Sequence, residues 1–312
     1  MTRRVALQMD ALASINPHTD TTLRLGIEAQ RRGYEVWQYT PDKLHYRDGN
    51  IFVRAARAFL HDDESHWFEL SEETLLDIKN FDVVWLRQDP PFDMAYLTTT
   101  YMLERVHPKP YVVNHPASVR NLPEKWFPTE LKQFMTPTLI ASDIQSIREF
   151  RAEYKDVVIK PLYGHGGNGI FRVQEGDANF GALMETLFAG SNNPWVVQKF
   201  LPEMAQGEVR IILIDGKFSA IAGRIPPAGE TRAALRIGAK YIKAEATKRH
   251  MEICEALSPM LRKHELLLTG IDVIGDWLTE INITSPSSIP PINRLYGTRL
   301  EADVWDALEK KL

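Results

Sequence analysis

Three oxygen-bearing side chains lie close together near the C-terminal end of the sequence, in residues 270–286 (GIDVIGDWLTEINITSP): Asp272, Glu280 and Asn282. Glu280 and Asn282 are two residues apart in an apolar run, so they share one face of a strand. An oxygen-only set suits Mg²⁺, which keeps several waters and is usually completed by phosphate oxygens. We therefore interpret the three side chains as a magnesium site. The alternative is an amphipathic hairpin with a solvated acidic face.

Whether Asp272 joins the other two depends on the register of this hairpin. A two-residue turn at Gly275-Asp276 places Asp272 on the opposite face, because side chains alternate along a strand. A three-residue turn with a bulge pairs residue 272 with residue 280 and brings all three side chains together. The sequence leaves both registers open.

A second chemical feature is the glycine-rich stretch KPLYGHGGNGIFRV at residues 160–173, with glycines at 164, 166, 167 and 169. It matches G-x-G-x-x-G, but that fingerprint requires a following helix, and the lead-out IFRV is typical of a strand. No Lys-Ser or Lys-Thr pair follows, as a P-loop requires. A strand–glycine loop–strand unit is the geometry of a flap over ATP phosphates, and an ordinary hairpin is the alternative.

Together the two features predict an ATP–Mg²⁺ site without a P-loop. Lys125 and Lys160 would each meet phosphate oxygens, whereas either lysine alone would more simply be a solvated cation. The segment QKFLPE at residues 198–203 would lie at the adenine edge, and Glu208 would hold the ribose.

Composition is that of an ordinary soluble enzyme. The 312 residues are 44% hydrophobic and 25% charged, and the net charge of −4 argues against nucleic acid or a membrane surface as a partner. Cys254 is the only cysteine, so no disulfide framework exists, and we expect a buried structural thiol. No secretory signal or membrane-length apolar run is evident, which predicts a cytoplasmic protein.

The order of elements predicts two architectures. Up to about residue 122, strands alternate with helices, which implies a mostly parallel α/β sheet. Its strand ends carry Arg87, Asp89 and Asp93, which could orient a charged small molecule or simply form a proline-stiffened turn. From residue 157 strands come in pairs, including a hairpin at Asp215-Gly216, which is α+β antiparallel character. We expect 227–245 to be a long loop, functional or disordered.

These motifs resemble bacterial glutathione synthetase, an ATP-grasp ligase. The segments QMDALASIN, LRQDPPFDMAY, VVNHPASVRNLPEK, IKPLYGHGGNGIFRV, GETR and GIDVIGDWLTEINITSP carry the resemblance in order and nearly end to end. It implies the ATP-grasp fold, with an N-terminal α/β domain at 1–122 and an ATP-grasp domain at 123–312. Within the latter, a central lid would span about 123–200 and a C-terminal part about 201–312.

The resemblance also implies a reaction: ATP phosphorylates the cysteinyl carboxylate of γ-glutamylcysteine, and glycine attacks the acyl phosphate. Mg²⁺, two ions by analogy, would be the cofactor, with Mn²⁺ as an alternative, and the protein would be a homo-oligomer, usually a tetramer. The implied metal ligands are Asp272, Glu280 and Asn282. The implied ATP-binding residues are Lys125, Lys160, Gly164, Gly166, Gly167, Gln198, Lys199, Phe200, Leu201 and Glu208. The residues facing phosphate or substrate carboxylate are Arg210, Arg224 and Arg232.

The sequence departs from the family pattern in two segments that border the substrate side. Ala234 and Ala239 stand where an asparagine and a glycine are usual, and 287–295 reads SSIPPINRL instead of an Ile-Arg-Glu run. Two other functions therefore remain open: a ligase for another carboxylate and amine, and an ATP-binding module without catalysis.

Overall fold

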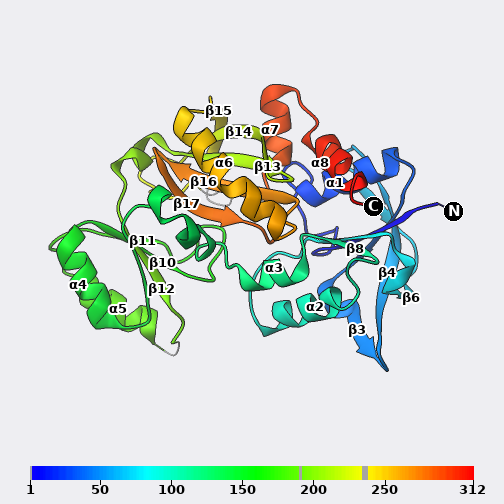
Figure 1. The fold of residues 1–312 in the computed structure, drawn as a ribbon, viewed down its shortest axis with the longest axis horizontal. Helices are drawn as coiled ribbons and strands as arrows, with labels where there is room; N and C mark the ends of the chain where they lie inside the picture. Colours follow the sequence, from blue (N-terminus) through cyan, green and yellow to red (C-terminus); the bar gives the residue numbers. More distant parts are fainter. Residues whose placement is uncertain (1, 190–191, 234–237) are drawn as a thin grey trace.

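The protein is described by a computed structural model, which covers residues 2–189, 192–233 and 238–312. It contains three β-sheets with helices packed against them (Figure 1). The first sheet is formed by the N-terminal part of the chain, the second by the middle and the third by the C-terminal part. Among the described residues, no helix is both long enough and apolar enough to cross a membrane.

The N-terminal sheet has a parallel centre, as the alternating pattern predicts. Its four parallel strands, in spatial order, are β2 (Glu35–Tyr39), β1 (Arg4–Gln8), β7 (Val83–Leu86) and β8 (Tyr111–Val113). Every residue of β7 is buried, which is why it reads as a continuous apolar run. The helices of this part are α1 (Thr21–Arg31), α2 (Met94–Glu104) and α3 (Pro116–Asn121), and its 3₁₀ turns are η1 (Pro41–Lys43) and η2 (Ile78–Asn80).

Sequence analysis did not foresee an antiparallel extension on this sheet. It comprises β3 (Leu44–Arg47), β4 (Asn50–Leu60), β5 (Phe68–Leu70) and β6 (Thr74–Asp77), with β4 paired to the other three and to β2. Buried and less buried residues mostly alternate along β4. The alternation of apolar and polar residue types is broken, because Phe52 and Phe59 lie on the less buried face.

The middle of the chain forms a four-stranded antiparallel sheet in the order β11, β10, β12, β9. Its strands are β9 (Thr138–Ala141), β10 (Val157–Pro161), β11 (Phe171–Val173) and β12 (Trp195–Lys199), and its helices are α4 (Ile144–Tyr154) and α5 (Phe180–Phe188). Ile147, Ile159, Phe180 and Val197 form its separate small core. A 3₁₀ segment, η3 (Phe127–Phe134), leads into it and packs against the C-terminal sheet.

The C-terminal sheet has the order β15, β14, β13, β16, β17, and all its pairings are antiparallel. Its strands are β13 (Glu208–Ile214), β14 (Lys217–Ile225), β15 (Lys240–Lys243), β16 (Leu268–Ile274) and β17 (Trp277–Asn282). The predicted Asp215-Gly216 hairpin is confirmed, because Ile214 pairs with Lys217. The predicted loop at 227–245 is wrong in its second half, since residues 240–243 pair with β14. The 3₁₀ turn η4 (Pro202–Gln206) precedes β13.

Three C-terminal helices complete the fold. α6 (Lys248–Lys263) covers the C-terminal sheet and buries Cys254, and burial raises the pKa of that thiol to about 12. α7 (Ile289–Tyr296) and α8 (Leu300–Glu309) lie beside α1 (Figure 1). Trp305 of α8 packs edge-on against Trp85 of β7, with the ring centroids 5.8 Å apart. The end of the chain thereby shares one core with its beginning.

A single buried asparagine connects the first and third sheets. Asn114 follows β8, and its Nδ2 donates to the carbonyls of Leu268 and Ile283, both at 2.8 Å. The backbone N–H of Leu268 donates to Asn114 Oδ1 at 3.1 Å. The side chain therefore holds the ends of β16 and β17 against the N-terminal sheet.

Replacing this asparagine should destabilise the protein. Asn114→Ala leaves buried backbone groups of Leu268 and Ile283 without partners, and each such group costs about 1–3 kcal/mol. We expect a lower urea midpoint, corresponding to a loss of at least about 2 kcal/mol, monitored by circular dichroism. The matched control is Asn192→Ala at an exposed position. Equal midpoints for the two variants would contradict the role given to Asn114.

Candidate active site

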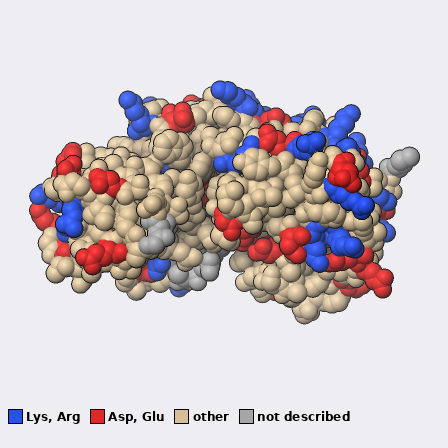
Figure 2. Space-filling view, turned by 90° about the horizontal axis from the view of Figure 1, so that it is seen from below, with Lys and Arg blue, Asp and Glu red and all other residues tan. Residues whose placement is uncertain are grey.

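A cleft of about 630 Å³ lies where the three sheets meet. The face shown in Figure 2 is hollowed between two lobes. Loops of the N-terminal sheet, the glycine-rich loop of the middle sheet and strands β13, β14, β16 and β17 all contribute to the lining. The sequence-predicted site residues line this cleft, with two exceptions: Gly164 lines a small neighbouring pocket, and Asp93 lines neither.

The β16–β17 hairpin brings the predicted metal ligands together by a route that sequence analysis did not foresee. The turn has two residues, because Ile274 pairs with Trp277. Thr279 is then an extra residue that forms a bulge, so that Asp272 pairs with Glu280. A bulge shifts the register by one residue and redirects the side chains beyond it. Of the two registers that the sequence left open, the structure has the two-residue turn of one and the pairing of 272 with 280 of the other.

Asp272 is the most strongly held of the three. Its carboxylate accepts hydrogen bonds from Arg210 Nε at 2.6 Å and Arg210 Nη2 at 2.9 Å, and Arg224 Nη2 lies 2.8 Å away. Burial favours the neutral acid, but the two guanidinium groups outweigh it and hold the pKa of Asp272 well below its usual range. Asp272 is therefore an anion with both oxygens directed at cations.

Glu280 lies close to the two predicted lysines, Lys125 and Lys160. Lys125 is buried, and its Nζ lies 2.7 Å from Glu280 Oε1 and also donates to the carbonyl of Gly164. Lys160 on β10 is buried nearby, and burial lowers its pKa to about 8, with Lys125 adding repulsion and Glu280 opposing the shift. The side chain of Glu280 thus lies between the hairpin and the middle sheet.

Asn282 completes the oxygen set. Its Nδ2 donates to Asp272 Oδ2 at 3.2 Å and to the Gly270 carbonyl at 3.3 Å. The amide places its Oδ1 as the remaining atom available to a hard cation. Two carboxylates and one amide oxygen on adjacent strands fit the ligand preference of Mg²⁺.

Glu208, predicted to hold a ribose, instead forms an ion pair with Arg224 in this structure. Burial raises the pKa of Glu208 to about 7, with Asp272 and Glu280 adding repulsion and Arg224 opposing it. The carboxylate would have to share this partner to bind a hydroxyl group.

The glycine-rich loop between β10 and β11 faces the cleft. Gly167 has φ +77°, a conformation that favours glycine, and a Cβ on Gly164 would lie 2.3 Å from Pro161 Cγ. Arg232 Nη1 donates to the carbonyl of Gly167 at 3.0 Å, and Arg232 is also paired with Glu230. The loop is therefore in contact with the segment after β14.

The predicted adenine-edge residues lie at the end of β12 and directly after it, and they line the cleft. Gln198 is buried and donates to Thr138 Oγ1 at 3.0 Å, whereas Lys199 is exposed. Phe200 lies under the guanidinium of Arg172 at 3.6 Å, and Leu201 is nearly buried. These side chains form a mixed apolar and polar wall, as a flat heteroaromatic ring requires.

On the N-terminal side, two of the three candidate residues reach the cleft. Arg87 is buried and donates to the carbonyl of Pro286 at 3.0 Å, and Asp89 accepts from Ser285 Oγ at 2.5 Å. Asp93 does not line the cleft; it caps α2 by accepting from the Tyr96 backbone N–H at 2.9 Å. The side chain of Asp93 is used locally instead.

Sequence analysis missed Glu124, which precedes Lys125. Its Oε1 accepts from the backbone N–H groups of Ile283 at 2.8 Å and Thr284 at 3.0 Å, and from Thr284 Oγ1 at 2.8 Å. Asp10 and Asp20 of the N-terminal loops also line the cleft, and burial raises the pKa of Asp20 to about 6. Asp20 is also the N-cap of α1, accepting from the Leu23 backbone N–H at 2.6 Å, whereas only the contacts of Glu124 across the fold reveal its position.

Of the two segments that depart from the family pattern, one is partly described. Ala239 is buried, and Ala234 lies outside the described residues. Ser288 has φ +98° and its Oγ lies 2.5 Å from the Tyr241 hydroxyl, just before α7 begins. The 287–295 segment is therefore largely helical, and it starts at the edge of the cleft.

The cleft lining carries seven Lys and Arg side chains and seven Asp and Glu side chains. Around the metal-ligand hairpin, Glu208, Asp272 and Glu280 lie among Lys125, Lys160, Arg210 and Arg224. Arg210 Nη1 and Arg224 Nε are buried and have no hydrogen-bond partner among the described residues. Buried donors without partners are costly, so this arrangement favours an incoming polyanion.

Two antiparallel sheets border a cleft that contains buried arginines, lysines and oxygen ligands, and a parallel α/β domain lies next to them. This is the architecture of an ATP-grasp ligase. The chain is similar along 99% of its length, with a TM-score of 0.63 and 16% identity, to an ATP-grasp ligase, PsnB, solved with a precursor variant, Mg and ADP. That structure is covered over 98% of its own chain.

Sequence relatives narrow the class further. The family models for the N-terminal domain and the ATP-grasp domain of prokaryotic glutathione synthetase match residues 4–120 and 124–297. The chain is 46% identical over 311 residues to the glutathione synthetase of Rhodopseudomonas palustris, covering 100% of this chain and 99% of the relative. It is 44% identical over 311 residues to that of Mesorhizobium japonicum, with the same coverage. The chain belongs to the prokaryotic glutathione synthetase family.

The burial of Lys160 has a measurable consequence. We expect Lys160 to be acetylated with an apparent pKa of about 8, because the uncharged amine is the nucleophile and burial favours it. Its reactivity should therefore rise as pH increases through 8, whereas the unfolded chain should titrate near about 10.4. Trace acetylation followed by peptide mass spectrometry measures both. A folded-state value as high as the unfolded one would contradict this environment.

Proposed function

We propose that this protein catalyses the ATP-dependent ligation of γ-glutamylcysteine and glycine to glutathione, releasing ADP and phosphate. The observation that carries the proposal is the pair of orphaned guanidinium donors, Arg210 Nη1 and Arg224 Nε, beside the carboxylate of Asp272. A phosphate group would supply acceptors for these donors. Membership of the family supports γ-glutamylcysteine and glycine as the substrates.

The metal-binding part of the site is assigned to Asp272, Glu280 and Asn282, which would hold Mg²⁺, two ions by analogy with the family, or Mn²⁺. Bound Mg²⁺ would neutralise phosphate oxygens and orient them. For Asp272 to bind a cation, Arg210 and Arg224 must share or exchange their contacts with its oxygens. Phosphate entering the cleft offers both arginines that alternative.

The remaining assignments follow from position. Lys125 and Lys160 would contact phosphate oxygens once Lys125 loosens from Glu280. Gln198, Lys199, Phe200, Leu201 and Glu208 would surround the nucleoside, and Gly164, Gly166 and Gly167 would approach the phosphates with their backbone. A carboxylate is a poor acyl donor, and phosphorylation converts its oxygen into a leaving group. Positive charge around the transferred phosphoryl group promotes this step, which explains why no protein nucleophile is required.

Exclusion of water is the second requirement, because water hydrolyses an acyl phosphate. The glycine-rich loop already contacts Arg232 through the Gly167 carbonyl and Lys125 through the Gly164 carbonyl. Both contacts lie at the cleft, where they would hold the loop over a bound nucleotide. Arg232 would then act on the substrate side of the closed cleft.

The organisation of the chain is part of the same proposal. We place an N-terminal domain at 1–122 and an ATP-grasp domain at 123–312, with the lid at about 123–200. A cytoplasmic homo-oligomer, a tetramer by analogy with the family, is the assembly we propose. Size-exclusion chromatography with light scattering measures that assembly directly.

The decisive assay measures product mass. With ATP, Mg²⁺, γ-glutamylcysteine and glycine, we expect glutathione to form, and no product when any one component is omitted. ADP release without glutathione would instead indicate a ligase for another carboxylate and amine, an alternative that the unusual 287–295 segment favours. ATP binding without turnover would indicate a non-catalytic module. Either outcome would overturn the proposed reaction.

The metal assignment is tested by a carboxylate-to-amide exchange. We expect Glu280→Gln to lower kcat/KM at least about 100-fold and to raise the Mg²⁺ concentration needed for half-maximal activity, because an anionic metal ligand is lost. The control is Asp276→Asn, the same chemical change at the exposed turn of the same hairpin. Similar activity and Mg²⁺ dependence in the two variants would argue against Glu280 as a ligand.

A further inference from the structure

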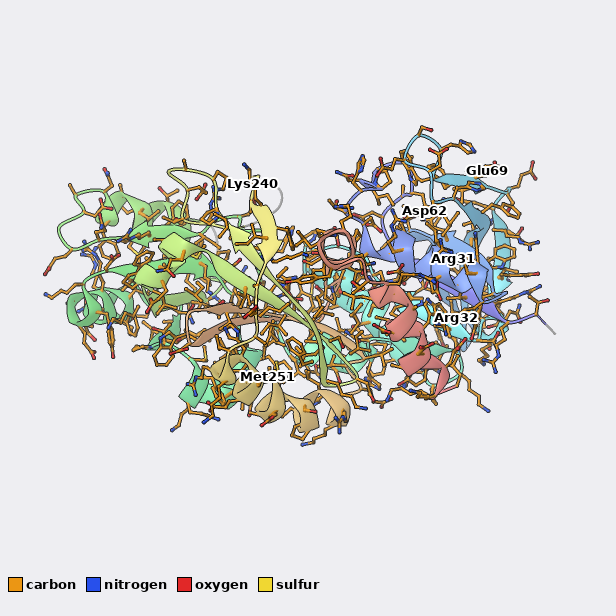
Figure 3. All side chains as sticks on the ribbon, turned by 90° about the horizontal axis from the view of Figure 1, so that it is seen from above. Arg31, Arg32, Asp62, Glu69, Lys240 and Met251 are labelled. Carbon is orange, nitrogen blue, oxygen red and sulfur yellow. The ribbon has the colours of Figure 1, made fainter. Side chains whose placement is uncertain are left out.

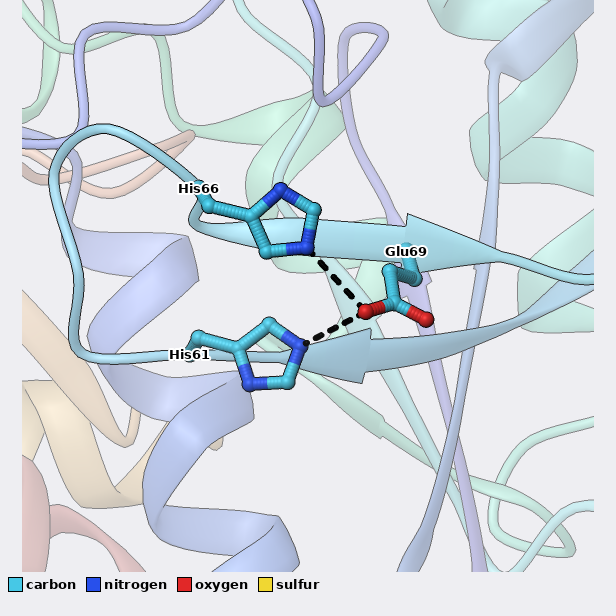
Figure 4. A group of neighbouring side chains, drawn as sticks. All are labelled: His61, His66 and Glu69. Carbon is cyan, nitrogen blue, oxygen red and sulfur yellow. Dashed lines mark hydrogen bonds and ion pairs between the residues drawn. The ribbon is translucent and has the colours of Figure 1, made fainter.

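A group of metal-ligating side chains lies outside the cleft, on the β4–β5 hairpin of the N-terminal sheet. His61, His66 and Glu69, which we call the hairpin cluster, direct two imidazole nitrogens at one carboxylate oxygen (Figure 4). His66 Nε2 lies 3.1 Å from Glu69 Oε1, and His61 Nε2 lies 3.7 Å from the same oxygen. The three ligand atoms lie within 4.8 Å of one another.

These separations are close to those of a filled metal site. Zn–N and Zn–O bonds of about 2.0–2.2 Å at tetrahedral angles place ligand atoms about 3.3–3.6 Å apart. The two measured distances to Glu69 Oε1 bracket that range. A cation placed between the three atoms would need only small side-chain rotations.

We propose that the hairpin cluster binds a divalent transition-metal ion, of which Zn²⁺ is the representative, through His61 Nε2, His66 Nε2 and Glu69 Oε1. Two imidazoles and one carboxylate suit Zn²⁺, Co²⁺, Ni²⁺ or Cu²⁺, whereas Mg²⁺ and Ca²⁺ prefer oxygen ligands. The site therefore differs in kind from the oxygen-only set in the cleft. Three protein ligands leave a fourth position for water or another small ligand.

The hairpin holds the ligands in place before any ion arrives. Glu69 pairs with Phe59 in the β4–β5 ladder, and the backbone N–H of His61 donates to the Trp67 carbonyl at 2.9 Å. Trp67 Nε1 in turn donates to the carbonyl of Leu12 at 2.9 Å, and its ring packs against the core. Ligands fixed by a strand ladder and an anchored aromatic ring lose little conformational freedom on binding.

The local charge and an unused nitrogen both favour a cation. Residues 61–69 read HDDESHWFE, with four acidic side chains and no lysine or arginine. Only part of this charge is offset, for example where Asp62 lies 3.6 Å from Arg31; Figure 3 labels both, together with Glu69. His61 Nε2 is buried and has no hydrogen-bond partner among the described residues. A metal ion would give that nitrogen a partner.

A second group with suitable residue types, His107, His115 and Glu265, is less suited to a metal. His107 Nδ1 accepts a hydrogen bond from the Val112 backbone N–H at 3.2 Å. The neutral ring therefore carries its proton on Nε2, the atom that faces Glu265 at 3.4 Å. Metal binding at Nε2 would require breaking the backbone contact, a cost that the hairpin cluster does not carry.

The test is a Co²⁺ titration of the full-length protein in excess Mg²⁺, following the visible absorption of bound Co²⁺, with Zn²⁺ as competitor. We expect saturable binding of one ion per chain, displaced by Zn²⁺. Because losing a supporting second-shell partner already weakens metal binding about 10–100-fold, His66→Ala and Glu69→Gln should each weaken it at least about tenfold. His45→Ala, on the neighbouring β3 strand, is the matched control and should bind like the unaltered protein.

A loss of Co²⁺ binding in these variants should not result from unfolding. The side chains of His66 and Glu69 are 61% and 62% exposed, so both variants should keep the unaltered Tm without metal. Added Zn²⁺ should raise the Tm of the unaltered protein, since a ligand that binds only the folded state stabilises it, and should not raise that of the variants. No saturable Co²⁺ binding, or equal binding in all variants, would overturn the proposal.

Discussion

The carboxylate of Asp272, held between two guanidinium groups in a nearly dry environment, is the interaction on which the cleft depends. A buried carboxylate without partners is strongly unfavourable, and a buried arginine is equally so. The sheet solves both problems at once, because Arg210 lies directly opposite Asp272 in the β13–β16 ladder. On the next strand Arg224 lies opposite Glu208 and reaches Asp272 as well. Charges that no single element could bury are neutralised by their neighbours.

The neutralisation is incomplete, and this gives the cleft its chemistry. Some guanidinium hydrogens, on Arg210 Nη1 and Arg224 Nε, have no acceptor within the described part of the chain. In the proposed reaction, phosphate would supply oxygen acceptors for these donors. Its binding would release arginine from Asp272 and lysine from Glu280, and the freed oxygens would become available to a cation.

The position of the cleft depends on connections between distant parts of the chain. Asn114 ties the end of β8 to β16 and to the residue after β17. Arg87 and Glu124 bind the segment 283–286 from the other side. This segment therefore lies between the N-terminal sheet and the metal-ligand hairpin. These contacts engage the backbone N–H groups of Ile283 and Thr284 and the carbonyls of Ile283 and Pro286, which holds the segment in place.

Much of the architecture could be predicted from sequence. Apolar runs separated by helical periods indicated the parallel core, and the Asp215-Gly216 pair indicated its hairpin, because turn chemistry is local. Strand β4 escaped notice, since Phe52 and Phe59 on its less buried face break the alternation of apolar and polar residues. Residue types and spacing also identified the glycine-rich loop and the three oxygen-bearing side chains Asp272, Glu280 and Asn282. A phosphate-binding loop requires glycines and a Mg²⁺ site requires oxygen ligands, so residue type alone carries this signal.

The tertiary structure alone decided how those residues meet. The sequence determined that Glu280 and Asn282 share a face, because strand periodicity is a local property. Only the bulge at Thr279 decided that Asp272 joins them. The free-energy cost of one bulge is too small to leave a signal in the composition, and the formation of a bulge depends on the neighbouring strands. Likewise, nothing local showed that Glu208 pairs with Arg224 or that Glu124 holds residues 283 and 284. Charges are placed by contacts across the fold, and spacing along the chain does not contain those contacts.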